Sequence, residues 1–254
     1  MDLIDTILAE HPTFHRGETE INRIFNHSES FLTKIEIEKL SSKKLTCYGI
    51  AADVAYFIRD SINSYSRTAE TGVGISTLIF ALKNSIHTAI TPNQEEVKLI
   101  RRYADTKKIG LDHIKFVIKS SDQYLPNSEL HNLDMVFIDG KHAFPWPVID
   151  WFYTADKLKQ GGIMLVDDAY MNSVKIIVDF MSADPRWTIT KQFKNRTFAF
   201  RKESTSVHTV AWHMQPYNFG ITSHRKRLIS WITARLKNNY LNIIIAVCYL
   251  FVIT

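Results

Sequence analysis

The sequence is poor in cysteine, lacks a secretion signal and contains no acidic residue after Glu203. Its two cysteines, Cys47 and Cys248, stand too far apart to make a zinc-binding pattern or a disulfide framework. The first twenty residues lack the basic flank, apolar run and small-residue cleavage site of a signal peptide. We therefore expect a cytoplasmic protein in a reducing compartment.

The excess positive charge is confined to the C-terminal part of the chain. The formal net charge is +5, and five basic residues follow Glu203, so residues 1–203 are neutral overall. A neutral main domain lacks the electrostatic footprint that binding to a polyanion requires, and we expect no nucleic-acid partner. The five basic residues are Arg225, Lys226, Arg227, Arg235 and Lys237.

The segment 224–254 combines these charges with an apolar end. Its last fourteen residues, from Leu241, would rise about 21 Å as a helix, which is short of the roughly 30 Å hydrocarbon core of a bilayer. Basic residues beside an apolar helix attract anionic lipid, so we expect peripheral contact with a membrane surface. The alternative is a helix that packs on its own domain or on a second subunit of a homodimer.

A change of periodicity divides the chain into three parts. Residues 1–61 place apolar residues at spacings of three and four, which predicts an N-terminal helical cap. Residues 62–202 alternate β-prone runs with amphipathic helices, an order that predicts a doubly wound α/β fold with a mainly parallel sheet. Residues 203–254 form a C-terminal helical extension. The β-prone runs are 67–70, 87–91, 115–120, 134–140 and 161–168, the helices include 76–84, 93–109, 147–160 and 172–184, and 187–202 predicts two antiparallel strands.

The stretch "ETGVGIST", from Glu70 to Thr77, occupies the first loop between a strand and a helix, where doubly wound folds bind ligands. Gly72 and Gly74 permit a tight turn and a close approach, while Ser76 and Thr77 can cap the helix. The loop lacks the lysine of a P-loop, and Thr77 replaces the third glycine of a dinucleotide-binding loop. The carboxylate of Glu70 would repel phosphate but suits an ammonium or a ribose hydroxyl. A simple glycine turn is the alternative.

Acidic residues follow two neighbouring strands of the predicted sheet. Asp139 ends one apolar run, His142 follows three residues later, and Asp167 and Asp168 end the next run. The carboxyl ends of parallel strands meet at one edge, so these groups should gather there, and their mutual repulsion calls for a cation or a proton. Oxygen ligands suit Mg²⁺, Ca²⁺ or Mn²⁺. The alternative is that the aspartates cap a helix and orient a loop and that His142 packs within its loop.

The motifs "AETGVGIST", "FIDGKHAF" and "GGIMLVDDAY", in this order and spacing, resemble class I S-adenosylmethionine-dependent methyltransferases. The likeness is greatest to the group with a D-G-x-H motif, which is similar in layout to catechol-type O-methyltransferases. It spans about Gly49 to Lys202. It implies a Rossmann-like seven-stranded sheet with an antiparallel last strand, S-adenosylmethionine as cofactor, and O-methylation of a small molecule, a sugar or a lipid-linked acceptor.

The resemblance also implies roles for individual residues. Asp139, Asp167 and Asp168 would hold a divalent cation, and His142 stands where the catechol-type enzymes carry a catalytic lysine. Asp139 and His142 are thus the implied catalytic residues, and His142 could take the proton of the acceptor hydroxyl. The implied cofactor-binding residues are Glu70, Thr71, Gly72, Gly74 and Ser76 for the methionine part, Thr91 for the ribose, and Ser121 and Asp122 near the adenine.

Two positions depart from the family pattern. The second strand usually ends in an acid that binds the ribose hydroxyls, but this chain has Thr91, so Asn93 or Gln94 would have to substitute. At the fifth strand the catechol-type pattern has aspartate then asparagine, whereas here Asp168 follows Asp167, which leaves a metal-free reaction open.

Three functions therefore compete. The first is the methyltransferase, and the second is a binding or scaffold module with weakened cofactor chemistry, tethered by its tail. An NAD-dependent oxidoreductase is disfavoured because Thr77 and Thr91 remove both the third glycine and the ribose acid. The aromatic residues Phe144, Trp146, Trp151, Phe152 and Tyr153 wall an acceptor pocket in one interpretation and belong to the core in the other.

Overall fold

A computed structural model of the protein describes residues 2–10, 12, 14, 50–194, 196–208 and 211–219. The helical pattern predicted within 21–40 and the predicted membrane-facing segment 224–254 lie outside these residues. Within the described part of the chain, no helix is long and apolar enough to cross a membrane.

Strands and helices alternate along the chain from residue 67 to residue 202. The strands are β1 (Arg67–Thr71), β2 (Ile86–Thr91), β3 (Ile114–Ile118), β4 (Leu133–Ile138), β5 (Leu158–Val166), β6 (Trp187–Phe193) and β7 (Thr197–Lys202). The α-helices are α1 (Leu3–Glu10), α4 (Ala52–Ser61), α5 (Ile75–Leu82), α6 (Gln94–Lys107), α7 (Ser121–Tyr124), α8 (Trp146–Ala155) and α9 (Asn172–Ala183). Short 3-10 helices are η1 (Leu125–Asn127), η2 (Trp212–Met214) and η3 (Pro216–Phe219).

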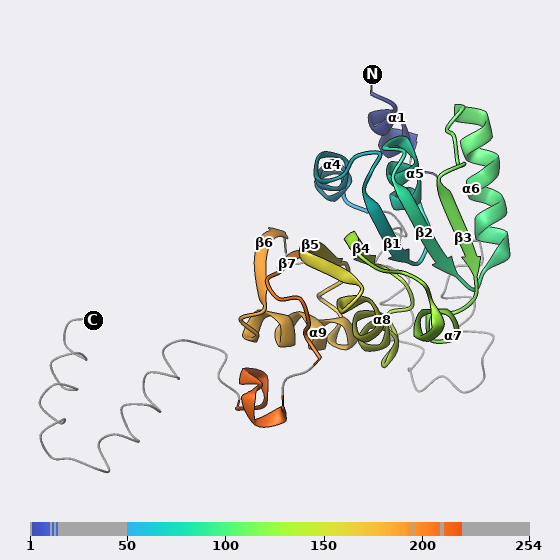
Figure 1. Ribbon diagram of the computed structural model, residues 1–254. Coiled ribbons are helices and arrows are strands. Elements are labelled where there is room, and N and C mark those ends of the chain that lie inside the picture. The colour runs from blue at the N-terminus through green and yellow to red at the C-terminus, as the bar shows by residue number, and fades with distance from the viewer. Residues whose placement is uncertain are drawn as a thin grey trace, which may run out of the picture.

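The strands form one seven-stranded sheet in the order β3-β2-β1-β4-β5-β7-β6 (Figure 1). The first five strands pair in parallel, because a helical crossover separates each from the next. β7 runs antiparallel to β5 and β6. This confirms the predicted Rossmann-like, doubly wound sheet with an antiparallel last strand.

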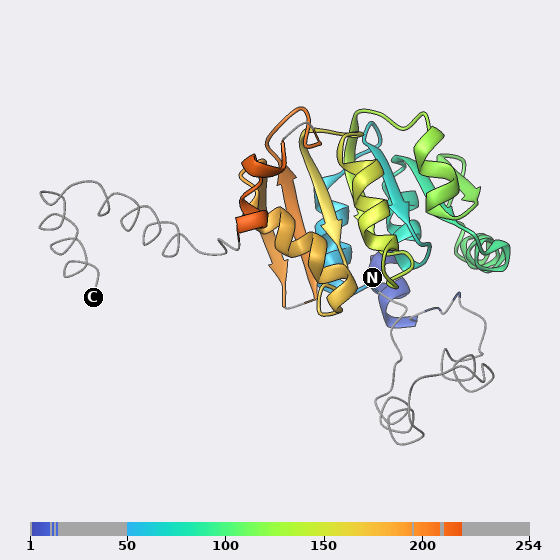
Figure 2. The same ribbon diagram turned by 90° about the horizontal axis from the view of Figure 1, so that it is seen from below.

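Helices cover both faces of the sheet. α1, α4, α5 and α6 lie on one face, and α8 and α9 lie on the other (Figures 1 and 2). On β4, Met135 and Phe137 belong to the core of the first face and Val136 and Ile138 to the core of the second, as the alternation of side chains along a strand requires. Burying each such side chain contributes about 1.5–3 kcal/mol. The central strand β4 is therefore apolar on both faces from Met135 to Ile138, and Asp139 follows directly at its end.

The boundary between α8 and β5 differs from the prediction. The helix predicted over 147–160 ends at Ala155, and β5 begins at Leu158 rather than at residue 161. The side chain of Lys202, which is fully buried, donates hydrogen bonds of 2.7 Å to the carbonyl oxygens of both Ala155 and Leu158. A distant lysine thus binds the last carbonyl of the helix and the first carbonyl of the strand, a contact that local sequence patterns do not reveal.

Candidate functional site

The candidate site lies where the sheet order reverses between β1 and β4, the position at which open α/β sheets bind ligands. The loops after β1, β4 and β5 are joined by backbone hydrogen bonds at this edge. The amide of Asp139 donates to Thr71 O at 3.1 Å, and the amide of Asp167 donates to Ile138 O at 3.1 Å. The sheet therefore brings the three motifs together, as expected.

The loop after β4 packs so closely on position 72 that only a glycine fits there, whether or not a ligand binds. Its φ is +85°, and a Cβ atom there would lie 2.2 Å from the carbonyl oxygen of Asp139. No other residue fits without moving the backbone after β4. Gly74 has an extended φ of 178°, and its amide donates to Thr77 Oγ1 at 3.0 Å. Close packing of two loops therefore explains Gly72. The approach of a ligand to this glycine stays a prediction.

Glu70 is buried beneath the loop that it precedes. Its carboxylate accepts hydrogen bonds from Ser76 Oγ at 2.6 Å and from Thr77 Oγ1, and the residue is only 1% exposed. The two hydroxyls that we expected at the helix start thus point inward, where they hold the loop on β1. Glu70 organises the loop from below, and direct contact of Glu70 or Ser76 with a cofactor stays a prediction.

His87 on β2 completes this buried cluster, and sequence reasoning missed it. Its Nε2 lies 3.2 Å from Glu70 Oε1, close enough for an electrostatic contact but outside hydrogen-bond geometry. Its Nδ1 lies 2.8 Å from Thr68 Oγ1, and its ring stacks on Phe80 at 4.1 Å. The signal that could have found it was its place in a strand of a sheet covered on both faces, because β2 is buried from His87 to Thr91 and a buried histidine needs polar partners.

An acidic side chain from α6 lies at the end of β2, although the strand itself ends in Thr91. Thr91 Oγ1 donates a 2.9 Å hydrogen bond to Glu96 Oε2, and the amide of Asn93 donates to Thr91 Oγ1 at 3.1 Å. Asn93 caps α6, since its Oδ1 accepts from the amide of Glu95. One turn of helix thus returns the Glu96 carboxylate to the strand end, where the sequence alone suggested that an acid was missing.

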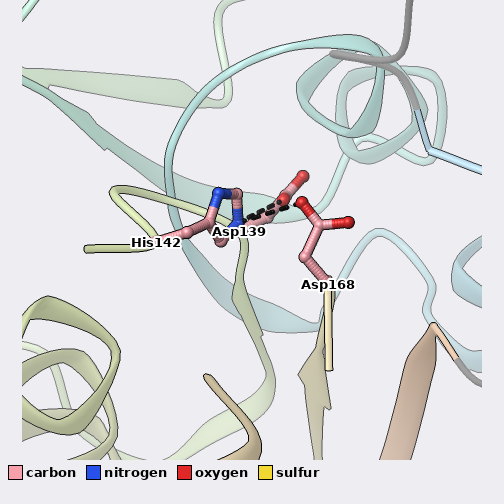
Figure 3. A group of neighbouring side chains, drawn as sticks. All are labelled: Asp139, His142 and Asp168. Atoms are coloured by element: carbon pink, nitrogen blue, oxygen red, sulfur yellow. Dashed lines mark ion pairs between the residues drawn. The ribbon is translucent and has the colours of Figure 1, made fainter. Parts of the chain in front are cut away.

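Asp139, His142 and Asp168 converge beside the loop of Gly72 (Figure 3). His142 Nε2 lies 3.5 Å from Asp139 Oδ1 and 3.3 Å from Asp168 Oδ2. One ligand atom from each residue lies within 4.8 Å of the others, as a metal ion would require. The side chains of Asp139 and His142 are about a quarter exposed, at 26% and 27%, so solvent or a substrate can reach them.

The pKa of each of these three groups is raised above its ordinary value. Burial raises the pKa of Asp139 to about 7, and the charges of Asp167 and Asp168 add to this, although a hydrogen bond with His142 opposes it. Burial by itself would lower the pKa of His142, but the hydrogen bond and charge of Asp139, with Asp168 and Asp167, outweigh it and raise that pKa. Burial followed by the charge of Asp167 likewise raises the pKa of Asp168. A shared proton or a cation relieves such a cluster.

Asp167, which we expected among the metal ligands, lies apart from this group. Its carboxylate is 1% exposed and accepts hydrogen bonds from Arg196 Nε at 3.2 Å, Arg196 Nη2 at 2.9 Å and Thr197 Oγ1. The guanidinium already neutralises this carboxylate. The described residues whose ligand atoms lie close enough to share a metal ion are Asp139, His142 and Asp168, and the binding of a metal by Asp139, Asp167 and Asp168 stays a prediction.

Arg196 also shapes the turn that carries Asp168. Its backbone oxygen accepts a 2.8 Å hydrogen bond from the amide of Ala169, and its Nε lies 3.1 Å from Asp168 Oδ1. Asp168 has a φ of 55°, in the left-handed region that aspartate tolerates better than most residues. The start of β7 therefore holds the end of β5 in the conformation that directs Asp168 toward His142.

The predicted adenine-side residues begin a short helix. Ser121 is the first residue of α7 and is buried, whereas Asp122 is exposed.

The aromatic residues after His142 divide between the two interpretations, a core position and an exposed position beside an acceptor. Trp151 is buried against Phe180, with ring centroids 5.1 Å apart, but Phe144 is 64% exposed beside the candidate site.

Comparisons with known proteins agree with this geometry. A family model described as a methyltransferase domain matches residues 69–169. No curated protein sequence gives a significant match. Among solved structures, cofactor-bound Rv0187 from MTB is 14% identical and has a TM-score of 0.53, covering 73% of this chain and 97% of its own.

Two further structures share the fold at similarly low identity. A proposed caffeoyl-CoA O-methyltransferase from Staphylococcus aureus is 14% identical, with a TM-score of 0.54, over 72% of this chain and 99% of its own. The O-methyltransferase TomG from Streptomyces achromogenes, in complex with SAM, is 14% identical, with a TM-score of 0.51, over 61% of this chain and 82% of its own. The matched region 69–169 contains the glycine loop, the Asp139 to His142 segment and the Asp167–Asp168 pair, so all three motifs lie in the part of the chain that is similar to a methyltransferase domain.

Proposed function

We propose that the protein transfers a methyl group from S-adenosylmethionine to a hydroxyl of a small-molecule acceptor, such as a small metabolite, a sugar or a lipid-linked precursor. The observation that carries this proposal is the Asp139, His142 and Asp168 group, which lies at the reversal point of the sheet beside the glycine loop. This group can accept a proton from a hydroxyl or hold a cation that binds it.

The residues of this chain fit the cofactor. We propose that Glu96, held by Thr91 at 2.9 Å, binds the ribose hydroxyls in place of an acid at the strand end itself. Ser121 and Asp122, at the start of α7, lie at the end of β3, next to β2 in the sheet, where the adenine is expected. The methionine part would face the loop that Gly72 and Gly74 form. The scaffold alternative thereby loses its main sequence argument, the missing acid.

The same residues fit a divalent cation. The buried Nε2 of His142 lies 3.5 Å from Asp139 Oδ1 and 3.3 Å from Asp168 Oδ2, so a cation could take the place of the proton that these groups would share. We propose that Asp139, His142 and Asp168 hold the cation through two carboxylates and an imidazole, a set that suits Mn²⁺ or Mg²⁺. A cation bound there would act as a Lewis acid on the acceptor hydroxyl.

In the metal-free form of the reaction, His142 takes the proton. Its Nε2 lies between two carboxylates, at 3.5 Å and 3.3 Å, which stabilise the imidazolium that results. The raised pKa of His142 has the same origin and makes it a stronger base, provided that it starts neutral. Asp139 and Asp168 then hold the ring in one orientation through their contacts with Nε2.

The acceptor has an exposed aromatic surface available. Phe144 follows His142 by two residues and Tyr170 follows Asp168 by two, and they are 64% and 59% exposed. We propose that these rings contact the acceptor, since exposed rings beside a reactive group offer flat apolar area at low entropic cost. Replacing both by alanine should raise the acceptor KM more than the cofactor Kd.

The test combines calorimetry with a transfer assay. The wild-type protein should bind S-adenosylhomocysteine and transfer label from methyl-labelled S-adenosylmethionine to a panel of hydroxylated acceptors. His142→Ala should abolish transfer, whereas His113→Ala, at an exposed histidine remote from the site, should leave it unchanged. Loss of transfer in chelator, restored by Mn²⁺, would assign the metal-assisted form. Absence of S-adenosylhomocysteine binding at millimolar concentration would overturn the proposal.

A further inference from the structure

His87 is a fully buried histidine whose imidazole takes no part in the proposed reaction. It lies on β2, where it is paired in register with Thr68 of β1. Glu70 follows Thr68 by two residues, so both of these side chains project from the same face of the sheet. A buried imidazole needs polar partners, and the structure gives one to each ring nitrogen, Thr68 to Nδ1 and Glu70 to Nε2.

The hydroxyls on the Nδ1 side of the ring indicate which nitrogen carries a hydrogen. Ser85 Oγ donates a 3.1 Å hydrogen bond to Phe80 O, so its one hydrogen is used and it can only accept from Thr68. Thr68 Oγ1 lies 3.3 Å from Ser85 Oγ and 2.8 Å from His87 Nδ1. The hydrogen of Thr68 fits the shorter contact, in which Nδ1 accepts and carries no hydrogen of its own. A neutral ring then carries its hydrogen on Nε2.

The carboxylate on the other side of the ring favours the same tautomer. Nε2 of His87 lies 3.2 Å from Glu70 Oε1 and has no partner of hydrogen-bond geometry among the described residues. A bare nitrogen at this place would turn its lone pair toward a carboxylate oxygen, and two acceptors repel each other. An N–H group there places positive charge beside the carboxylate. The stack on Phe80, with ring centroids 4.1 Å apart, fixes the plane in which Nε2 lies.

Glu70 connects this contact to the glycine loop. Its carboxylate accepts hydrogen bonds from Ser76 Oγ at 2.6 Å and from Thr77 Oγ1. Thr77 Oγ1 in turn accepts from the amide of Gly74 at 3.0 Å. The contacts therefore run without interruption from β2 through the end of β1 to the loop and the start of α5.

We propose that His87 is a positioning residue, whose Nε2–H group orients Glu70 so that this carboxylate holds the loop from Gly72 to Thr77 in its cofactor-binding shape. The inference rests on the proposed function, because that function assigns the methionine part of the cofactor to this loop. His87 acts through Glu70 and needs no contact with the cofactor.

The first experiment observes the two ring nitrogens directly. Long-range nitrogen–proton correlation spectra of the protein without cofactor, labelled with ¹⁵N in its histidines, distinguish the tautomers. The signals that disappear in His87→Gln belong to His87. A hydrogen on Nε2, with or without a second one on Nδ1, supports the inference. A hydrogen on Nδ1 alone would overturn it.

The second experiment measures the Kd of S-adenosylhomocysteine by calorimetry for three variants of His87. His87→Phe keeps a ring to stack on Phe80 but has no nitrogen, and His87→Asn keeps a polar group only near the position of Nδ1. Both should weaken binding about tenfold. His87→Gln carries a donor near the position of Nε2 and should stay within about threefold of the wild type.

The order of these variants separates orientation of Glu70 from packing. Binding by His87→Phe as tight as that of His87→Gln would overturn the inference, because packing alone would then suffice. Thr88→Val is the matched control, since Thr88 is buried on the same strand but projects from the opposite face. It should leave the Kd unchanged. Should His87→Phe fail to fold, His87→Asn takes its place in this comparison and in those that follow.

A double-mutant cycle tests whether His87 acts through Glu70. Glu70→Gln should weaken binding, and the addition of His87→Phe should cause little further loss, because the carboxylate that the histidine orients is already gone. Additive losses would overturn the inference. This expectation holds whether or not Glu70 also touches the cofactor.

Hydrogen exchange separates this inference from the proposed function. In the protein without cofactor, His87→Phe should speed amide exchange in residues 72–77 relative to Thr88→Val. Unchanged exchange there would overturn the inference even if the enzyme binds its cofactor. A wild-type protein that binds no S-adenosylhomocysteine would overturn the proposed function, whereas the tautomer and the exchange rates would still decide whether His87 orients Glu70 and the loop.

Discussion

Arg196 and Asp167 form an ion pair with two contacts, in which Nε lies 3.2 Å from Oδ1 and Nη2 lies 2.9 Å from Oδ2. The pair joins the start of β7 to the end of β5. It neutralises the carboxylate of Asp167, while Asp168 contacts Arg196 Nε through Oδ1 at 3.1 Å and His142 Nε2 through Oδ2 at 3.3 Å. Arg196 therefore decides which acids remain available for catalysis or metal binding.

Removing this arginine should destabilise the protein. Arg196→Met leaves Asp167, which is 1% exposed, without its cation, and an uncompensated buried charge costs about 3–5 kcal/mol. The free energy of unfolding is measured by urea denaturation. The control is Arg201→Met, whose partner Glu203 is in an exposed pair and which should change stability by about 1 kcal/mol or less. Equal effects of the two variants would contradict the assignment.

Three glycine-to-alanine variants separate backbone strain from steric conflict. Gly110→Ala meets no atom within 4 Å and should be neutral, and Gly161→Ala, at a φ of +79° with open space, should cost about 1 kcal/mol. Gly72→Ala combines a φ of +85° with a contact of 2.2 Å to Asp139 O and should cost about 3 kcal/mol or more. Thermal and urea unfolding would give the ranking, and a mild Gly72→Ala would refute the close packing of the two loops.

Glu96 should act through the cofactor and not through stability. If its carboxylate binds the ribose hydroxyls, Glu96→Gln should weaken S-adenosylhomocysteine binding about tenfold to a hundredfold, because a hydrogen bond to a charged group is worth about 1.5–3 kcal/mol. Glu95→Gln, one residue earlier in the same turn of α6, is the control, since Glu95 pairs with Lys98 on the exposed surface. Calorimetry measures the Kd of S-adenosylhomocysteine for both variants, and their melting temperatures show whether stability has changed. A stronger loss for Glu95→Gln would sink the assignment.

The candidate cation site makes a prediction that does not depend on activity. Mn²⁺ binding, followed by electron paramagnetic resonance of the free ion, should weaken about tenfold or more in Asp168→Asn and Asp139→Asn. Asp179→Asn should bind Mn²⁺ as the wild type does, because Asp179 pairs with Lys175 on the exposed face of α9. Equal binding by all variants would assign the ion to another place, and no binding would favour His142 as the base.

Stability should depend on pH through Asp150. Burial raises the pKa of Asp150 from an ordinary 3.8 to about 6, and the charge of Asp122 also raises it. The hydroxyls of Ser121 and Thr71 and the charge of His142 lower that pKa, but by less than burial raises it. The folded state then binds a proton that the unfolded state has lost, so the free energy of unfolding falls as the pH rises from about 4 through about 6.

Asp150→Asn lacks this titration. Relative to the wild type, its free energy of unfolding should increase by about 2–3 kcal/mol between pH 4 and pH 8. The other titrating groups contribute almost equally to both proteins, so the difference isolates Asp150. Urea denaturation at the two pH values provides the measurement, and a difference independent of pH would show that the carboxyl titrates normally.

Much of the fold could be predicted from the sequence because its signals are local. The alternation of β-prone runs with amphipathic helices, and the polar residues that end those runs, follow from which residues face the two sides of a sheet. The order of the motifs then placed Gly72, Asp139 and Asp168 at one edge. The boundary of α8 was wrong by five residues at its end, because a buried lysine from β7 stops the helix at Ala155.

The sequence by itself determined the doubly wound sheet, the glycine loop and the gathering of acids at the strand ends. Only the tertiary structure decided how those acids are paired. Arg196 withdraws Asp167 from the cluster, His142 takes its place, and Glu96 returns from α6 to the end of β2. The physical reason is that a carboxylate's role depends on which cation, hydroxyl or proton lies within about 3 Å of it, and those partners come from distant parts of the chain.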